Sequence, residues 1–347
     1  MVRVLIVDDS PTVRELLTEI LHRDPEIEVI ATADNGSLAV QMVSTLKPDL
    51  VTMDLALPRM NGLEAIRSIM DTCPTPIIVV TGAMDPKDSK GVFNLISAGA
   101  LAVLPIPEGI GNSAHNESSK NLIAHIKALS EMKVHQRPKR SMTEPTFSLH
   151  SAEDPVLKPY QVLAMGASTG GPLIVRNILH DLPTDLPFSV LLAQHMTRGF
   201  MEGFVDWLSE EINHPIKIAE HGEIAVPGHV YCAPDYMDME LHRGMQLALK
   251  KHRTLYGPIP SISRLFASVA DACGSNAIAV LLTGMGNDGS EGMKRLKKKG
   301  ALTIAQNEES SVIYGMPKEA VKAGAVDHIL SPEEISKKIC SLLNSKR

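Results

Sequence analysis

Residues 162–172 read VLAMGASTGGP, a short apolar run followed by a serine between glycines and then by a helical pattern. This order predicts a buried strand, a tight turn that exposes Ser168, and a helix, because small residues let the chain turn sharply. A helix start also offers backbone N–H groups to developing negative charge. Similar turns hold phosphate groups, so this turn alone leaves a nucleophile and a phosphate site both open.

Two further strand ends carry polar residues to the same edge of the expected sheet. The apolar run over residues 189–193 leads to His195, and the run over residues 277–282 leads to Asp288. Because the carboxyl ends of parallel strands meet at one edge, we expect these residues to converge with Ser168. His195 would then take the serine proton while Asp288 fixes the imidazole tautomer. The chain order Ser, His, Asp differs from that of α/β-hydrolases and indicates another fold.

The turn that contains Asp288 has a second interpretation. Residues 284–289 also read G-x-G-x-x-G, and Glu308 follows about 20 residues later, as in a dinucleotide-binding fingerprint. An Asp inside the turn would repel a pyrophosphate, and a dinucleotide site leaves Ser168 and His195 without a role. The hydrolase is therefore favoured, and a dinucleotide-binding regulator remains the alternative.

The same alternation of short apolar runs with helical patterns extends over most of the chain. Strands are expected at residues 2–7, 29–33, 50–53, 77–81, 101–104, 162–165, 189–193, 277–282 and 302–305. Strands that alternate with helices predict parallel sheets covered on both faces. Residues 216–250 differ, because glycines and prolines punctuate short alternating runs there, and we expect inserted antiparallel hairpins.

A proline-containing stretch without periodicity divides the chain. It includes Pro138, Pro145 and Pro155, and we interpret residues 134–159 as a linker. The length of 347 residues also exceeds the usual size of one hydrophobic core. We therefore expect two doubly wound α/β domains, residues 1–133 and residues 160–347.

Acidic residues end two strands of the first domain. Asp8 and Asp9 follow the first strand and Asp54 the third, while Thr81 ends the fourth. Three carboxylates at one edge would raise a pKa sharply unless a divalent cation neutralised them, and hard oxygen ligands suit Mg²⁺. The alternative is that Asp8 and Asp9 cap the helix that begins near Pro11.

Three motifs of this domain resemble response-regulator receiver domains, which have a flavodoxin-like fold. They are VLIVDDS at residues 4–10, MDLALPRMNG at 53–62 and VVTGA at 79–83. The resemblance implies that Asp54 accepts a phosphoryl group from a histidine kinase, with Asp8 and Asp9 completing the Mg²⁺ site, and that Thr81 responds to the phosphoryl group. Two positions depart from the family pattern: Ile106 replaces a usual Lys, and Val103 replaces a usual aromatic residue.

Five motifs of the second domain resemble the chemotaxis-specific protein-glutamate methylesterases, whose catalytic domain is a Rossmann-like α/β fold. They are GASTGGP at residues 166–172, AQHM at 193–196, PGHVYCAPDYMDMEL at 227–241, LLTGMGNDGSEGM at 281–293 and AQNEESSVIYGMP at 305–317. The resemblance implies that Ser168 is the nucleophile, His195 the base and Asp288 the orienting acid. Thr169 and Met285 match neighbours that help to bind the substrate or its oxyanion.

The same resemblance implies a substrate and a partner. The family hydrolyses γ-glutamyl methyl esters on the cytoplasmic helices of chemoreceptors, and some members deamidate glutamines there. Residues 259–264, IPSISR, depart from the RPSVD that often precedes Leu-Phe in the family. A receiver joined to a hydrolase predicts that the first domain covers the Ser168 edge. A phosphorylation-gated scaffold that only binds receptors is the remaining non-enzyme alternative.

Composition excludes several other classes of protein. The net charge is −6, and the basic residues are scattered, which argues against a nucleic-acid partner. The four cysteines form no CxxC pair, so neither a zinc site nor a disulfide framework is expected. No apolar run reaches the roughly 18 residues of a membrane span, and no signal pattern is present. We expect a cytoplasmic protein without membrane insertion that needs no cofactor for catalysis.

Overall fold

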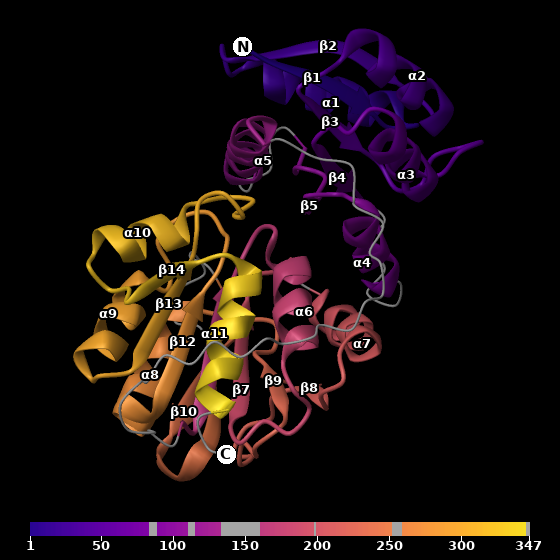
Figure 1. Cartoon of the computed structure of the whole chain (residues 1–347). Helices are drawn as coiled ribbons and strands as arrows, with labels where there is room; N and C mark the ends of the chain where they lie inside the picture. Colours follow the sequence, from indigo (N-terminus) through magenta and orange to yellow (C-terminus); the bar gives the residue numbers. More distant parts are fainter. Residues whose placement is uncertain (83–88, 110–114, 133–159, 198, 252–258, 345–347) are drawn as a thin grey trace.

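The computed structural model describes residues 1–82, 89–109, 115–132, 160–197, 199–251 and 259–344. These residues form two α/β units, each built on a parallel sheet, as the sequence predicts. The predicted linker, residues 134–159, lies outside the described residues. In Figure 1 the helices α4 (Ser89–Ala98) and α5 (His115–Ser130) and the strand β5 (Ala102–Pro105) of the first domain face the second domain.

The described part of the first domain is a five-stranded parallel sheet in the order β2-β1-β3-β4-β5. Its strands are β1 (Val2–Val7), β2 (Ile27–Ala33), β3 (Leu50–Met53), β4 (Ile77–Thr81) and β5 (Ala102–Pro105). Its helices are α1 (Pro11–His22), α2 (Gly36–Leu46), α3 (Gly62–Thr72), α4 (Ser89–Ala98) and α5 (His115–Ser130). The strand order reverses between β1 and β3, which opens a crevice at their carboxyl ends.

The start of α1 tests the alternative that Asp8 and Asp9 cap this helix. The cap of this helix is Ser10, whose hydroxyl accepts a hydrogen bond from the Val13 N–H at 3.4 Å. Asp8 instead accepts from the Ser10 N–H at 2.9 Å, before the helix begins. Neither Asp8 nor Asp9 is the helix cap, so their carboxylates need another explanation.

The described part of the second domain contains a seven-stranded parallel sheet in the order β14-β13-β12-β6-β7-β9-β8. Its strands are β6 (Val162–Ala167), β7 (Ser189–Gln194), β8 (Ile216–Ile218), β9 (Val230–Cys232), β12 (Ala277–Leu281), β13 (Leu302–Gln306) and β14 (His328–Leu330). Its helices are α6 (Gly171–Asp181), α7 (Met201–Glu211), α8 (Ile262–Cys273), α9 (Ser290–Lys298), α10 (Met316–Lys322) and α11 (Pro332–Asn344). The order reverses between β6 and β12, where ligand sites of open sheets lie.

The segment expected to form antiparallel hairpins does so only in part. Strands β10 (Met237–His242) and β11 (Gln246–Lys251) pair antiparallel, as predicted. Strands β8 and β9 instead pair with each other in parallel and extend the main sheet, so the prediction is wrong for them. Each has three residues, which is too short for an alternating pattern to reveal pairing direction. Glycine and proline mark turns between parallel as well as antiparallel strands, so they do not distinguish the two kinds of pairing.

The two domains touch through an aromatic cluster. Phe93 of α4 packs on α7, with its ring centroid 5.3 Å from that of Phe204 and 5.5 Å from that of Trp207. Phe93 is 1% exposed and belongs to the core of the second domain. Burying an aromatic side chain of this size contributes strongly to association, so Phe93 anchors the first domain on the second. Within the residues described here, no helix has both the length and the apolar character needed to cross a bilayer.

Candidate active site

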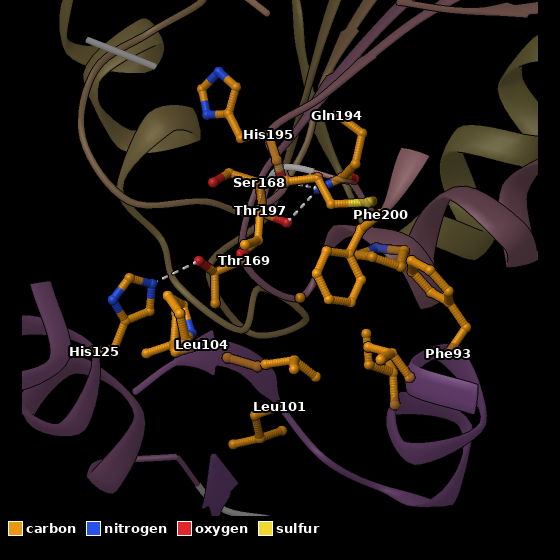
Figure 2. Close-up of a pocket in the computed structure, with 18 of the residues that line it drawn as sticks. Phe93, Leu101, Leu104, His125, Ser168, Thr169, Gln194, His195, Thr197 and Phe200 are labelled. Atoms are coloured by element: carbon orange, nitrogen blue, oxygen red, sulfur yellow. Dashed lines mark hydrogen bonds between the residues drawn. The ribbon is translucent and has the colours of Figure 1, made fainter. Parts of the chain in front are cut away.

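Three parallel strands deliver the predicted triad to one edge of the second sheet. Ser168 directly follows β6, His195 directly follows β7, and Asp288 lies between β12 and α9. His195 Nε2 lies 3.0 Å from Asp288 Oδ2. Ser168 and His195 line the same cavity and are seen together in Figure 2. The structure therefore gathers a hydroxyl, an imidazole and a carboxylate at one edge of the sheet, and the imidazole is hydrogen-bonded to the carboxylate.

The Asp288 carboxylate is held by the start of α8. Oδ2 accepts from the Ile262 N–H at 2.8 Å, and Oδ1 accepts from the Ser263 N–H at 3.0 Å. Burial of the Asp288 carboxyl raises its pKa. The hydrogen bond and charge of His195, together with the hydrogen bonds from Ser263, lower the pKa more strongly, so that it falls to about 2. A helix N-terminus stabilises an anion in the same way. Asp288 is therefore ionised near neutral pH.

The position of Asp288 also distinguishes the hydrolase interpretation of this turn from the dinucleotide-binding interpretation. Its Oδ1 accepts from the Gly289 N–H at 2.9 Å, directly before α9 begins at Ser290. A pyrophosphate in a dinucleotide fold would occupy this place at the helix N-terminus. A fixed carboxylate there repels a pyrophosphate, so the geometry disfavours the dinucleotide alternative.

Two buried polar side chains that the sequence did not single out support the turn around Ser168. Gln194 Nε2 donates to the carbonyl oxygens of Ser168 and His195, both at 2.9 Å. Thr283 Oγ1 donates to the Thr169 carbonyl at 3.0 Å. Gln194 is the last residue of β7, and Thr283 lies two residues beyond the end of β12; a polar residue at or just after a buried strand is the signal that could have revealed them. Gln194 joins the backbone of the expected nucleophile to that of the expected base.

Close packing also requires glycine at position 284. A Cβ atom on Gly284 would lie 2.5 Å from Ser168 Cβ, closer than any real contact of this kind. Any larger residue would displace Ser168 or the turn that carries Asp288. Met285, expected near the oxyanion, lies on this turn but is not among the described residues that line the cavity.

Thr169 lies at the boundary between the domains. Its hydroxyl is 3.2 Å from Nε2 of His125, on α5 of the first domain. The His125 Nδ1–H donates to the Asn121 carbonyl at 2.8 Å, so a neutral ring accepts from Thr169 through Nε2. Burial lowers the pKa of His125, against a raising effect of the Asn121 carbonyl. The first domain thus contacts the residue next to Ser168, as expected for a domain over this edge.

The cavity beside Ser168 has a volume of about 490 Å³ and walls from both domains. One wall comes from α4, β5 and α5, and includes Leu101, Leu104 and His125. The opposite wall comes from the loops after β6 and β7, and includes Ser168 and His195. The first domain therefore forms part of the surroundings of the candidate nucleophile.

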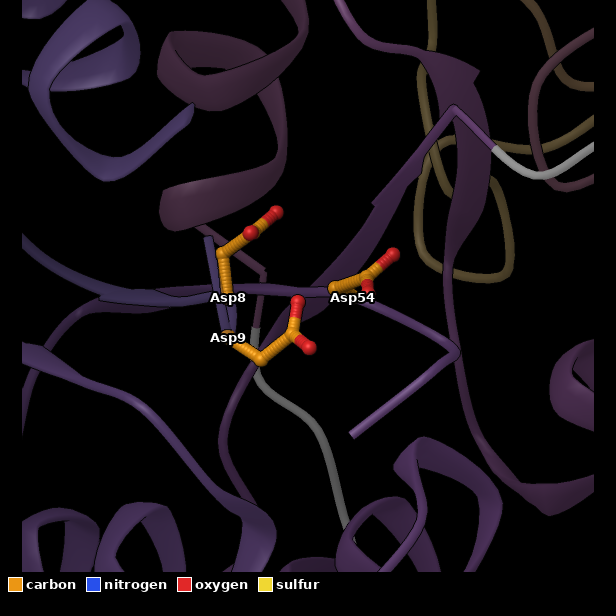
Figure 3. Close-up of side chains that lie close together, drawn as sticks. All are labelled: Asp8, Asp9 and Asp54. Atoms are coloured by element: carbon orange, nitrogen blue, oxygen red, sulfur yellow. The ribbon is translucent and has the colours of Figure 1, made fainter. Parts of the chain in front are cut away.

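The acidic residues of the first domain converge in a second site. The carboxylates of Asp8, Asp9 and Asp54 offer oxygen atoms that all lie within 4.8 Å of one another (Figure 3). Burial is the main cause that raises the pKa of Asp8 to about 6, and the charges of Asp54 and Asp9 add to it. A hard divalent cation neutralises such a cluster, and oxygen ligands match Mg²⁺. The donor set fits the metal that the sequence predicts.

Thr81 lies at the end of β4, on the same sheet edge as the acidic cluster. Its side chain is 1% exposed, and among the described residues its hydroxyl has no hydrogen-bond partner. A buried hydroxyl without a partner is costly, which favours a role in contacting a ligand.

Two family models match the chain, one over each α/β unit. The family model described as CheB methylesterase matches residues 163–339, and the response regulator receiver domain matches residues 4–107. The chain belongs to the CheB methylesterase family. A protein-glutamate methylesterase/protein-glutamine glutaminase of Nitrosospira multiformis is 46% identical, over 99% of this chain and 97% of that protein. A relative of the same name from Syntrophus aciditrophicus is 47% identical over 99% of both chains.

A solved structure supports the same fold for the second domain. The CheB methylesterase catalytic domain of Thermotoga maritima is 32% identical with a TM-score of 0.50, covering 53% of this chain and 98% of that one. The predicted resemblance and the α/β fold class are therefore confirmed.

The first domain departs from the receiver pattern where it meets the methylesterase domain. Ile106, at the usual Lys position, packs in one apolar cluster with Val312 and Ile313 of the methylesterase domain. Val103, at the usual aromatic position, lines the cavity beside Ser168. Both positions are apolar and form part of the domain boundary.

Proposed function

We propose that this CheB methylesterase family member hydrolyses glutamate methyl esters on chemoreceptor helices through Ser168, His195 and Asp288. The observation that carries this proposal is the 3.0 Å hydrogen bond between His195 Nε2 and Asp288 Oδ2, at a ring that shares a cavity with Ser168. An ionised carboxylate, an imidazole and a serine at a helix start are the components of acyl transfer.

The chemistry proceeds in two steps. Ser168 Oγ attacks the ester carbonyl while its proton passes to His195 Nδ1, and Asp288 stabilises the imidazolium. The oxyanion forms near the N-terminus of α6, which begins at Gly171. Its collapse breaks the ester bond, and methanol leaves with the proton from His195. Water then attacks the acyl-enzyme with His195 as base, which releases glutamate and restores Ser168.

Deamidation uses the same groups on an amide substrate. The relatives above carry the name protein-glutamine glutaminase as well, and their identity extends over almost the whole chain. For a glutamine substrate, His195 protonates a leaving ammonia in place of methanol. Both reactions end at a receptor glutamate, so one site accommodates them.

The first domain gates access to Ser168. In this proposal, residues 1–133 form the phosphoacceptor domain, residues 134–159 the linker and residues 160–347 the catalytic domain. A histidine kinase donates the phosphoryl group to Asp54; Asp8, Asp9 and Asp54 would hold Mg²⁺, which would neutralise negative charge at this site. The protein acts in the cytoplasm, where the receptor helices lie.

Methanol release from methylated chemoreceptors tests the proposal with the full chain. Wild type should release methanol, and Ser168→Ala should release it at the rate of the background. A fluorophosphonate should label Ser168 covalently in wild type. Near-normal methanol release by folded Ser168→Ala would show that the assigned nucleophile is wrong. Receptor binding without methanol release by wild type would instead support the scaffold alternative.

A further inference from the structure

The cavity between the domains has the size of a small-molecule binding site. The cavity has a volume of about 490 Å³, within the range of pockets that bind small ligands. Tyr236 lines the cavity and is 41% exposed, so the cavity reaches solvent at this residue.

We infer that, with the domains in contact, this cavity binds small uncharged carboxylic esters and that Ser168 hydrolyses them without domain separation. The inference rests on the proposed role of Ser168. It adds an activity on free small esters, and it assigns part of the acyl-chain pocket to the first domain.

The polarity of the walls selects this class of ligand. Val92, Phe93, Leu101 and Leu104 of the first domain are apolar, and Phe200 continues this surface on the catalytic side (Figure 2). The hydroxyl and imidazole groups of Ser168, Thr169 and His195 lie on the opposite wall. An ester carbonyl thus meets the nucleophile while its acyl chain lies against the first domain.

Charge also favours an uncharged ester. Among the described residues that line the cavity there is no Lys or Arg, and Asp235 is an acid. An anionic substrate would lose its hydration without gaining a cationic partner among these described residues, which disfavours its binding. The carboxylate product is disfavoured for the same reason, which promotes its release.

The reaction balances without a cofactor. Ser168 Oγ bonds to the acyl carbon, the bond to the alcohol oxygen breaks, and the alcohol leaves with a proton carried by His195. Water cleaves the acyl-enzyme, which gives the carboxylic acid and free Ser168. Both domains contribute to this pocket, so the first domain sets the acyl-chain preference while it excludes the receptor helix.

Leu101 is the position that tests the role of the first domain. It precedes β5, is partly buried and lines the cavity (Figure 2). The full-length protein is assayed with p-nitrophenyl acetate and p-nitrophenyl hexanoate, and the kcat/KM ratio of hexanoate to acetate is measured. Leu101→Trp should lower this ratio about tenfold by filling the pocket, and Leu101→Ala should raise it about threefold. Asn94→Ala, on the exposed side of α4, is the matched control and should leave the ratio unchanged.

Ser168→Ala measures hydrolysis by other nucleophiles and separates the two proposals. Wild-type ester rates above those of Ser168→Ala, with the Leu101 variants shifting the ratio, support the inference. Methanol release from receptors without small-ester hydrolysis above the Ser168→Ala rate would overturn the inference and leave the proposed function standing. Small-ester hydrolysis with the same ratio in both Leu101 variants would also overturn it. Absence of both activities in wild type would refute the proposed function itself.

Discussion

His195 Nε2 lies 3.0 Å from Asp288 Oδ2, which leaves Nδ1 as the ring nitrogen available to the proposed nucleophile Ser168. The same carboxylate accepts N–H groups from Ile262 and Ser263 at the start of α8. With the Gly289 N–H, which also donates to Oδ1, four nitrogen groups therefore converge on Asp288. The carboxylate is fixed in one orientation, and it fixes the imidazole tautomer in turn.

Asp288→Asn should lower kcat for methanol release by about 10⁴-fold. An amide keeps one oxygen and replaces the other by an NH₂ donor, so it cannot accept from both α8 N–H groups and from His195. Full-length protein and methylated receptors provide the assay. Ser263→Ala is the control, because it removes the Ser263 hydroxyl that accepts from the Gly289 N–H but leaves the Asp288 carboxylate in place. An equal loss in both variants, or a small loss in Asp288→Asn, would contradict the tautomer role.

Phe93→Ala should increase methanol release from receptors at least about fivefold. The Phe93 ring packs against Phe204 and Trp207 of the other domain, so its truncation weakens the contact between domains, by about 3–5 kcal/mol for full burial. A loss of this size in the free energy of domain contact brings the states with the domains together and apart to roughly equal populations, or favours the state with the domains apart. Asn94→Ala, one residue away but exposed, is the matched control. Unchanged release by a folded Phe93→Ala protein would rule out simple blocking by the first domain.

Acidic pH should weaken the contact between the domains through His125. Burial lowers the pKa of His125 from 6.5, so the folded state favours the neutral ring. The stabilisation is therefore fully present above about pH 6.5 and is lost as the pH falls through the lowered value. Amide exchange in α5, measured between pH 7.5 and 5.5, should report this loss.

His125→Gln is the control for this pH effect, because an amide oxygen accepts from Thr169 without titrating. The pH dependence of exchange should be smaller in this variant. His195 and Asp235 line the same cavity and also carry ionisable side chains. An identical pH dependence in wild type and His125→Gln would assign the effect to those groups.

Phosphate should activate the natural protein only weakly, and Ile106→Lys should increase the response. An apolar Ile106 cannot make the charge-assisted contact worth about 1.5–3 kcal/mol that would favour a phosphorylated state. Acetyl phosphate should label Asp54 slowly, and the ratio of esterase rates with and without it is the quantity to compare. Because Ile106 packs against the same apolar cluster as Val312 and Ile313, Ile106→Ala controls for lost packing. Strong activation of wild type that Ile106→Lys leaves unchanged would show that this position does not control the switch.

The sequence was informative wherever a local pattern determines structure. Alternating apolar runs and helical periods predicted both parallel sheets, and strand ends predicted that Ser168, His195 and Asp288 would meet. Parallel strands share one carboxyl edge, so this convergence follows from the strand order alone. The short strands β8 and β9 were assigned the wrong pairing, because three residues carry too little pattern.

The tertiary structure decided what depends on packing between distant segments. Which imidazole nitrogen binds Asp288, and how α8 holds that carboxylate, follows from contacts across 93 and 26 residues of chain. The contact of His125 with Thr169, and the cavity beside Ser168, require two domains to be placed against each other. Periodicity and propensity report the burial of each element, but they carry no distance between elements. The sequence therefore predicted which residues form the candidate site. The orientation of their side chains and the access to Ser168 depend on the tertiary structure.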